Sequence, residues 1–201
     1  MKNMWVAFIV ILILFVAFQS FMSISNSNIE KQQYRVIKAE KGFELRYYPP
    51  ATFATIKSSA KSFRDLSGNG FRKIAGYIFG NNESSTKIAM TSPVHMDINE
   101  KQSSMSFVMP SKYDAKSLPK PKDAQVEIHE TPGEYAAALS FGGFASDANI
   151  RKYSDQLKQL LDQKGIKPIG NFRYLGYNPP YQIIARKNEI IVAVEWNESM
   201  N

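Results

Sequence analysis

The feature that most constrains the fold of this chain is an internal repeat at an offset of 83 residues. The run Phe43–Arg46, followed by Pro49, returns as Val126–His129, followed by Pro132. In both copies a strand-like segment comes after the proline, and an amphipathic helical pattern comes next. The repeat therefore predicts one domain built from two equivalent halves.

One amphipathic helix is expected in each copy. The first is Ser62–Phe79, in which serine is a suitable N-cap and Gly80 with two asparagines ends the helical pattern. The second is Ser146–Lys164, closed by Gly165. Two glycines inside the first helix weaken it by roughly 1 kcal/mol each relative to alanine. Tertiary packing must offset that loss.

Short runs of β-favouring residues, bounded by prolines, glycines and polar residues, predict the strands. They are Tyr34–Ala39, Phe43–Tyr48, Ala51–Ile56, Lys87–Met90, Val94–Ile98, Met105–Met109, Tyr135–Phe141, Tyr174–Tyr177, Gln182–Ala185 and Glu189–Trp196. Ser92-Pro93 is expected to form a bulge or corner, and residues 111–123 a surface connection. Because tight turns link most of these strands, we expect an α+β domain with both helices packed on a curled antiparallel sheet. Curling would remove exposed sheet edges.

The chain begins with an apolar segment. Met4–Phe18 is uninterrupted, and the apolar character continues to Met22, near the lower length limit for a helix that crosses about 30 Å of hydrocarbon. A secretory signal peptide has the same plan: a basic start at Lys2, an apolar core, and small residues such as Ser23 and Ser25. The segment is therefore interpreted as a signal anchor or as a cleaved signal peptide.

These two interpretations give the same division of the chain. Residues 1–25 are the anchor or signal peptide, residues 26–33 a polar tether, and residues 34–197 the folded domain. The basic Lys2 favours the cytoplasmic side. The domain is thus expected on the periplasmic or extracellular side, held to the membrane through residues 4–22, or secreted if the leader is removed.

Composition excludes several kinds of site. The chain has no cysteine, so disulfides, thiolate nucleophiles and cysteine-containing zinc sites are impossible. Its net charge of +7 suits anionic partners, but the 25 lysines and arginines form no dense run, and no nucleic-acid partner is expected. There is no G-x-S-x-G motif, and no metal-ligand spacing joins His95 to His129, so both are interpreted as surface residues of strands. The sequence favours a binding module over an enzyme.

Aromatic and small residues suggest where a ligand would bind. The first predicted helix carries Phe71, Ala75 and Gly76, and a tyrosine cluster surrounds Pro179-Pro180 (Tyr174, Tyr177 and Tyr181). Such residues can form a shallow groove for a flat apolar ligand. Burial of about 300 Å² of ligand would contribute on the order of 7 kcal/mol before association costs. The same pattern also fits residues that only fill the core.

From about Tyr34 to Trp196 the sequence resembles the SOUL or haem-binding protein family. Two segments, Met90–Val94 and Tyr177–Pro180, carry the most specific part of the resemblance. Further matching segments are Tyr34–Ile37, Phe43–Tyr47, Lys87–Ala89, Phe141–Gly143 and Arg186–Glu189. The resemblance implies a distorted antiparallel β-barrel with two helices, built from a duplicated motif.

The resemblance also implies non-catalytic binding of haem or protoporphyrin, in a shallow groove between the first helix and the loop near Tyr177. Carried over to this chain, the groove consists of Phe71, Ala75, Ile78, Met90, Ser92, Tyr177 and Tyr181. The family shares no single axial histidine, so His95 is one candidate iron ligand beside Met90, Met96 or a tyrosine.

The basic side chains that meet the propionates in family members are replaced here. Their positions correspond to Gly68, Gly76 and Gln182. Arg72, Lys73 or Arg186 would have to substitute for them. Because related bacterial barrels bind small-molecule effectors, the alternative expectation is a barrel that binds another small amphipathic ligand.

Overall fold

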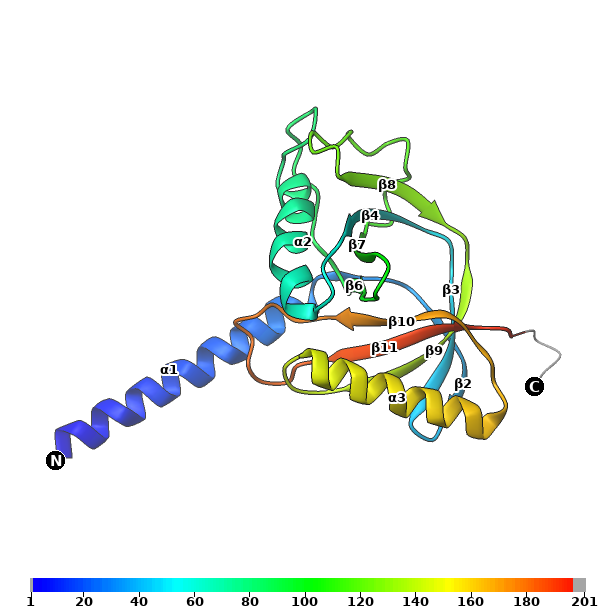
Figure 1. The fold of residues 1–201 in the computed structure, drawn as a ribbon. Helices are drawn as coiled ribbons and strands as arrows, with labels where there is room; N and C mark the ends of the chain where they lie inside the picture. The colour runs from blue at the N-terminus through cyan, green and yellow to red at the C-terminus, as the bar shows by residue number, and fades with distance from the viewer. Residues whose placement is uncertain (1, 197–201) are drawn as a thin grey trace.

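Within residues 2–196, which the computed structural model describes, nine strands form one antiparallel sheet (Figure 1). Its strand order is β2-β3-β9-β11-β10-β6-β7-β4-β8. The elements are α1 (Lys2–Ser27), β1 (Glu30–Lys31), β2 (Arg35–Glu40), β3 (Phe43–Tyr48), β4 (Ala51–Ser58), α2 (Phe63–Ile78), β5 (Thr91–Ser92), β6 (Val94–Asp97), β7 (Ser103–Val108), β8 (Val126–Thr131), β9 (Glu134–Phe141), α3 (Asp147–Lys164), β10 (Pro168–Gly176) and β11 (Asn188–Val194). β1 and β5 form a separate parallel pair.

The two sequence repeats occupy equivalent places in the sheet. The first repeat contributes β3, β4, β6 and β7, and the second contributes β8, β9, β10 and β11. The first strand of each repeat pairs with the second strand of the other, β3 with β9 and β8 with β4, while β6 and β10 meet at the centre. Each half therefore needs the other to complete its sheet. The predicted α+β class with a duplicated core is confirmed.

The sheet is curled but not closed. β2 lies at one edge and β8 at the other, so the barrel is a loose one. The expectation that curling removes exposed edges is wrong. Both edge strands instead carry exposed charged side chains, such as Arg35 and Lys38 in β2 and Glu127 and Glu130 in β8, which discourage pairing with another chain.

Each half of the sheet carries one helix. α2 packs on β4, β7 and β8, and α3 packs on β9, β10 and β11. Both helices start at the predicted caps: the Ser62 hydroxyl accepts from the N–H of Asp65 (3.1 Å), and the Ser146 hydroxyl from the N–H of Asn149 (3.2 Å). α3 ends at Gly165, whose φ of 67° suits glycine.

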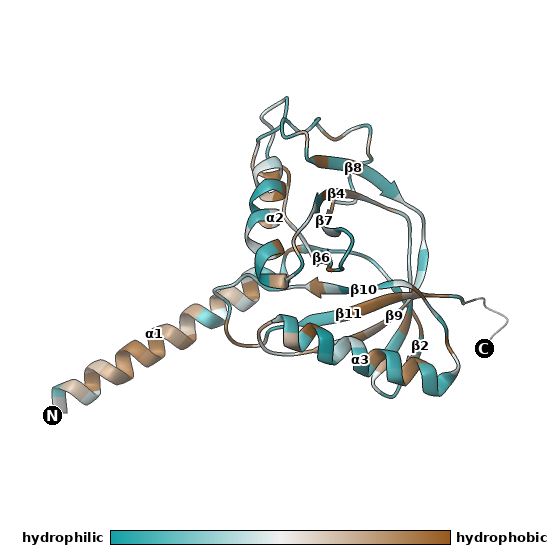
Figure 2. Cartoon of the chain, viewed as in Figure 1, coloured by the Kyte–Doolittle hydropathy of each residue, from teal (hydrophilic) through white to brown (hydrophobic). Residues whose placement is uncertain are grey.

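The core lies between these helices and the sheet, where the brown, hydrophobic stripes of α2 and α3 face inward (Figure 2). α2 approaches β4 closely at Gly70, because a Cβ there would lie 3.0 Å from Cδ1 of Ile56. Close packing thus accompanies the glycine that weakens the helix. Fully buried side chains from the helices include Leu66, Ile74, Ile78, Leu157 and Leu161.

Two of the predicted strands are wrong. Lys87–Met90 is an extended segment beside α2, where the N–H of Ile88 donates to the carbonyl of Ile78 (2.8 Å). Gln182–Ala185 lies in the loop between β10 and β11. The β-branched residues favour a strand there, but the N–H of Ile183 bonds to a side chain of α1 instead of a neighbouring strand.

The other predicted elements correspond to observed ones with shifts at their ends. Residues 111–123 are a surface connection, as predicted. The Ser92–Pro93 peptide bond is cis and separates β5 from β6 at the predicted corner. β10 starts earlier than predicted, at Pro168, and its pairing with β11 is irregular between Ile169 and Arg173.

α1 projects away from the domain (Figure 1) and is apolar along most of its length (Figure 2). Over Asn3–Asn26 it is long and apolar enough to cross a membrane, a test that signal sequences and core helices of soluble proteins also pass. Its C-terminal end meets the β10–β11 loop through Gln19 and Asn26. Residues 26–33 lie against the domain, where β1 pairs with β5.

Candidate ligand-binding site

One flank of α2 presents aromatic side chains to solvent. Phe71, Ala75 and Phe79 recur at intervals of four residues, so they lie in one row along the helix. Phe71 and Phe79 are 40% and 60% exposed, and Ala75 between them is buried. The Phe71 ring rests on Phe107 of β7, with 5.4 Å between ring centroids. No atom lies within 4 Å of a Cβ built at Gly68, near the start of the row. The row is a shallow apolar surface with open space beside it.

The three basic side chains expected near this flank differ in whether they have hydrogen-bond partners. Lys73 donates to the side-chain oxygen of Gln125, and Arg186 donates to three carbonyl oxygens of its own loop. Arg72 follows Phe71 directly and is exposed, and within residues 2–196 no hydrogen bond or ion pair engages its guanidinium. Of the three, Arg72 alone therefore has a guanidinium without a partner among the described residues.

The other predicted groove residues of this region lie deeper. Ile78 is fully buried between α2 and the sheet. Met90 is half-buried and packs against the core from the segment beside α2. Ser92 is buried in β5. The structure thus brings Phe71 and Ala75 together on one surface and places Ile78 and Ser92 beneath the surface.

Tyr177 lies on the opposite face of the sheet from the helices. Its ring packs on Ala138, Leu175 and Ile191, which alternate along their strands with the residues packed under the helices. Its hydroxyl donates to the Glu189 carboxylate (2.6 Å). Tyr177 therefore belongs to a buried polar network rather than to the α2 flank.

The centre of this network is an ion pair between Arg46 and Glu189, which are 2% and 0% exposed. Two parallel hydrogen bonds of 2.9 Å join the Arg46 guanidinium to the two carboxylate oxygens. Ser140 donates to the same carboxylate (2.9 Å), and Lys187 pairs with it (3.0 Å). The network joins β3, β9, β11 and the loop after β10. Arg46, Tyr177, Lys187 and Glu189 come from segments of the sequence that resemble the family, and Ser140 precedes another such segment. Together these residues hold the three strands and the loop in place.

The charges of the network are stable at neutral pH. Burial raises the pKa of Glu189, but the hydrogen bonds and the charge of Arg46 lower it by more, so that the pKa is lowered to about 2. Burial raises the pKa of the Tyr177 hydroxyl, and the neighbouring Glu189 charge raises it more. Glu189 therefore stays ionised and Tyr177 stays protonated, so the hydrogen bond between them persists at neutral pH.

Tyr181 is 57% exposed in the β10–β11 loop. Its carbonyl oxygen accepts from the Gln19 side chain of α1 (3.2 Å). The loop that the sequence placed beside the first helix of the domain is thus in contact with the N-terminal helix.

The prediction that both histidines lie at the surface is right for His129 and wrong for His95. His95 on β6 donates from Nε2 to the side-chain oxygen of Gln32 (2.7 Å) and meets the Phe53 ring edge-on. Burial lowers its pKa to about 3, and the Arg173 charge lowers it as well, so His95 is neutral. The covering residue comes from the segment after α1, and no local pattern reveals that contact. In the described part of the chain no group of three or more His, Asp or Glu residues is arranged to hold a metal ion.

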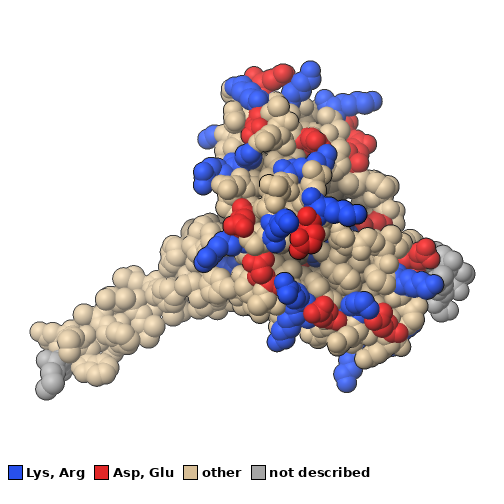
Figure 3. Space-filling model, in the orientation of Figure 1, with Lys and Arg blue, Asp and Glu red and all other residues tan. Residues whose placement is uncertain are grey.

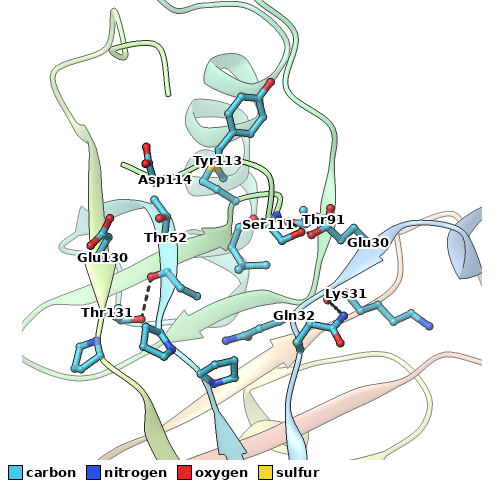
Figure 4. A pocket seen from close by; sticks show the side chains of 17 residues that line it. Glu30, Lys31, Gln32, Thr52, Thr91, Ser111, Tyr113, Asp114, Glu130 and Thr131 are labelled. Carbon is cyan, nitrogen blue, oxygen red and sulfur yellow. Dashed lines mark hydrogen bonds between the residues drawn. The ribbon is translucent and has the colours of Figure 1, made fainter. Parts of the chain in front are cut away.

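A pocket of about 540 Å³ opens between β1, β4 and the segment after β7 (Figure 4). Three carboxylates, from Glu30, Asp114 and Glu130, and one lysine, Lys31, line it. A second pocket of about 340 Å³, which reaches His95, shares part of this wall. Both volumes suit small molecules. The acidic lining favours a cationic ligand and disfavours the carboxylates of a tetrapyrrole. Sequence reasoning missed both pockets because their walls come from distant segments.

Several curated proteins are similar in sequence. Heme-binding protein 1 of Xenopus laevis is 28% identical over 165 residues, which cover 77% of this chain and 86% of that protein. Heme-binding protein 1 of Mus musculus is 29% identical over 161 residues, which cover 76% of this chain and 84% of that protein. Heme-binding protein 2 of Mus musculus is 28% identical over 157 residues, which cover 74% of this chain and 76% of that protein.

Solved structures share the fold at lower identity. The EcmrR C-terminal domain has a TM-score of 0.57 at 12% identity and covers 82% of this chain and 99% of its own. A hydrolase from Listeria innocua has a TM-score of 0.53 at 9% identity and covers 86% of this chain and 97% of its own. At such identities the likeness shows the fold alone.

The family comparison covers most of the chain. The SOUL heme-binding protein family matches residues 29–193, which include the whole sheet except the last residue of β11, both α2 and α3, and the Arg46–Glu189 network. This chain belongs to the SOUL heme-binding protein family.

Proposed function

We propose that this chain binds haem or another tetrapyrrole, without catalysis, by apolar contact along the α2 flank. Family membership over residues 29–193 carries the proposal, and the exposed row of Phe71 and Phe79 above Ala75 supports its location. Of the other residues expected in the groove, Met90 lies in the segment beside α2, and Tyr177 and Tyr181 lie in the loop after β10.

The residues of the flank suit the shape and charge of the ligand. A porphyrin is flat and apolar on both faces, and the phenylalanine row offers an apolar surface of small relief. Arg72 would meet a propionate at the edge of the ring. This apolar contact does not depend on iron ligation. His95, one of the candidate iron ligands, is buried and bonded to Gln32.

Hemin titration of the full chain in detergent micelles, followed by the Soret band, tests the proposal. Metal-free protoporphyrin should bind with similar affinity, because the contact is apolar. Phe71→Ala removes about 80 Å² of exposed aromatic surface, 40% of the side chain, which is worth about 2 kcal/mol, or about 30-fold in Kd.

Two control variants locate the ligand. Ile169→Ala removes a side chain that is 48% exposed at the far end of β10 and should leave the affinity unchanged. Tyr181→Ala weakens binding only if the ligand also reaches the β10–β11 loop. No Soret shift at tens of micromolar hemin would end the haem proposal, and equal effects of Phe71→Ala and Ile169→Ala would remove the α2 flank from it.

The placement of the chain is part of the same proposal. Residues 1–25 act as a signal anchor, or as a signal peptide if cleaved, and residues 34–197 form the ligand-binding domain on the periplasmic or extracellular side; of these, residues 1 and 197 lie outside the described part of the chain. The apolar helix over Asn3–Asn26 supports this placement. Figure 3 shows lysines and arginines interspersed with acidic residues over the visible face of the domain, an arrangement that gives no reason to propose a nucleic-acid partner.

A second candidate function is supported by the acidic pocket of about 540 Å³. Glu30, Asp114 and Glu130 would attract a small amphipathic cation, and Tyr113 and Met109 give the pocket apolar wall. Binding of a fluorescent lipophilic cation that is undisturbed by excess protoporphyrin, and weakened by Glu130→Gln, would favour this function. Competition between the two ligands would assign both to one site.

A further inference from the structure

The apolar helix α1 contains a buried glutamine. Residues 4–22 hold only two polar side chains, Gln19 and Ser20. Gln19 is 4% exposed, although most of the helix around it is exposed to solvent. Its Nε2 donates to the carbonyl of Tyr181 (3.2 Å), and its Oε1 accepts from the N–H of Ile183 (2.9 Å). The amide thus has its partners in the β10–β11 loop, residues 177–187.

The position of Gln19 along α1 determines how deep this loop would lie in a bilayer. Measured from Asn3, where the apolar segment starts, Gln19 lies about 24 Å along the helix at a rise of about 1.5 Å per residue. The hydrocarbon layer is about 30 Å thick. In a helix that spans the bilayer from Asn3, Gln19 is therefore still inside the hydrocarbon boundary of the far leaflet, and its bonds bring Tyr181 and Ile183 to the same depth.

The backbone of this loop is prepared for an apolar environment. Irregular backbone is tolerated at membrane depth only where its polar groups have partners. The Arg186 guanidinium donates to the carbonyls of Asn178, Pro179 and Gln182. The Gln182 side chain donates to the carbonyl of Ile184, and the Asn178 side chain accepts from the N–H of Lys187. These bonds pair several carbonyls and one N–H of the loop, while Oε1 of Gln182 and Nε of Arg186 are buried without a hydrogen-bond partner.

The outward side chains of the loop are apolar. Tyr181, Ile183 and Ile184 are 57%, 49% and 51% exposed. Residues 177–187 contain no acidic side chain, and Arg186 and Lys187 are basic. An apolar surface with tyrosine and adjacent basic residues matches the interface of a bilayer with anionic lipids.

We infer that the β10–β11 loop is a second membrane contact, in which Tyr181, Ile183 and Ile184 enter the leaflet that α1 leaves. This inference rests on the proposed tether, in which α1 spans the membrane. Gln19 positions the loop: its amide is shielded by the loop backbone, and the loop is held against the helix. A ligand that partitions into the bilayer would then meet the domain at its membrane-facing end.

The absence of native cysteine allows a direct test with single labelled cysteines. The full chain is reconstituted into vesicles of phosphatidylcholine and phosphatidylglycerol, with an environment-sensitive fluorophore at Ile183→Cys, and brominated lipids serve as quenchers. The matched control is Ile169→Cys, which is 48% exposed at the other end of β10. A probe at Phe15→Cys reports on α1 itself.

The inference expects brominated lipids to remove most of the emission at positions 183 and 15 and little at position 169. Quenching at position 15 without quenching at position 183 would refute the loop contact and leave the tether standing. No quenching at either position would refute the tether. Shielding of position 183 that depends on protein density, not on lipid bromination, would assign the surface to a second copy of the chain and overturn the inference.

A substitution in α1 tests the role of Gln19. Gln19→Leu keeps the helix apolar, so the probe at position 15 should stay quenched. The loop loses the side chain that bonds to Tyr181 and Ile183, so quenching at position 183 should fall markedly. Unchanged quenching at position 183 in this variant would overturn the role assigned to Gln19.

Discussion

Replacement of Arg46 by methionine removes the cation that compensates Glu189 inside the domain. Loss of one partner of a buried ion pair costs about 3–5 kcal/mol, since the other charge stays buried. The hydroxyls of Ser140 and Tyr177 and the ammonium of Lys187 still reach the Glu189 carboxylate. We therefore expect the lower end of that range, about 3 kcal/mol, and a decrease in Tm of about 6–12 °C for a domain of this size.

The cost should depend on pH in a defined direction. The pKa of Glu189 is lowered from 4.5 to about 2 in the folded chain, so its charge stabilises the fold above pH 4.5 and this contribution is lost as the pH falls toward 2. In the Arg46→Met variant Glu189 stays buried without its main partner, and its pKa rises. Protonation then relieves the buried charge, so the deficit of the variant should shrink between pH 7 and pH 4.

Urea unfolding of the full chain in micelles, followed by tyrosine near-UV circular dichroism at pH 7 and pH 4, measures both effects. Lys57→Met is the matched control, because Lys57 pairs with Glu127 at 2.8 Å but both side chains are about half exposed. Exposed pairs contribute about 1 kcal/mol or less. A deficit below about 1 kcal/mol for Arg46→Met, or one that is equal at both pH values, would refute the role assigned to the buried pair.

Three further predictions concern the helices and the buried histidine. Gly68→Ala should raise the free energy of unfolding by about 1 kcal/mol, since no atom lies within 4 Å of a Cβ at that position. Gly70→Ala should give no such gain, because its Cβ would lie 3.0 Å from Cδ1 of Ile56. Urea unfolding compares the two variants, and equal gains would contradict the packing argument. Ser62→Ala should cost about 1 kcal/mol by loss of the α2 cap, measured in the same way. The pKa of His95 is lowered from 6.5 to about 3, so stability should be greatest above pH 6.5 and should fall toward pH 5 by up to about 2 kcal/mol. His95→Gln should flatten that part of the profile, and an unchanged slope would show that another group titrates there.

Much of the fold follows from local sequence patterns, such as the internal repeat and the helix caps. The offset of 83 residues predicted two equivalent halves, and in the sheet each repeat pairs its first strand with the second strand of the other, β3 with β9 and β8 with β4. Ser62 and Ser146 cap the helices as expected, because capping depends on residues only three positions apart. The apolar start of the chain likewise predicted a helix, and α1 is one.

The candidate ligand-binding site could be predicted only in part from such local patterns. The motif residue Tyr177 and the helix residue Phe71 are expected in one groove, yet Tyr177 faces a polar network on one side of the sheet and Phe71 lies on a helix that covers the other side. Side-chain periodicity states which residues share a face of one element. It does not state which elements, far apart in the chain, share a surface.

Only the tertiary structure decided the contacts between distant segments. Arg46 and Glu189 are 143 positions apart, and Gln19 is 164 positions from Ile183. Nothing near either residue in the sequence signals its partner, because a buried charge or amide is satisfied wherever the fold brings a complementary group. The sequence by itself determined the repeated halves, their helices and most of their strands. The packing of those halves and of α1 determined which polar groups are buried together and which apolar side chains remain on the surface.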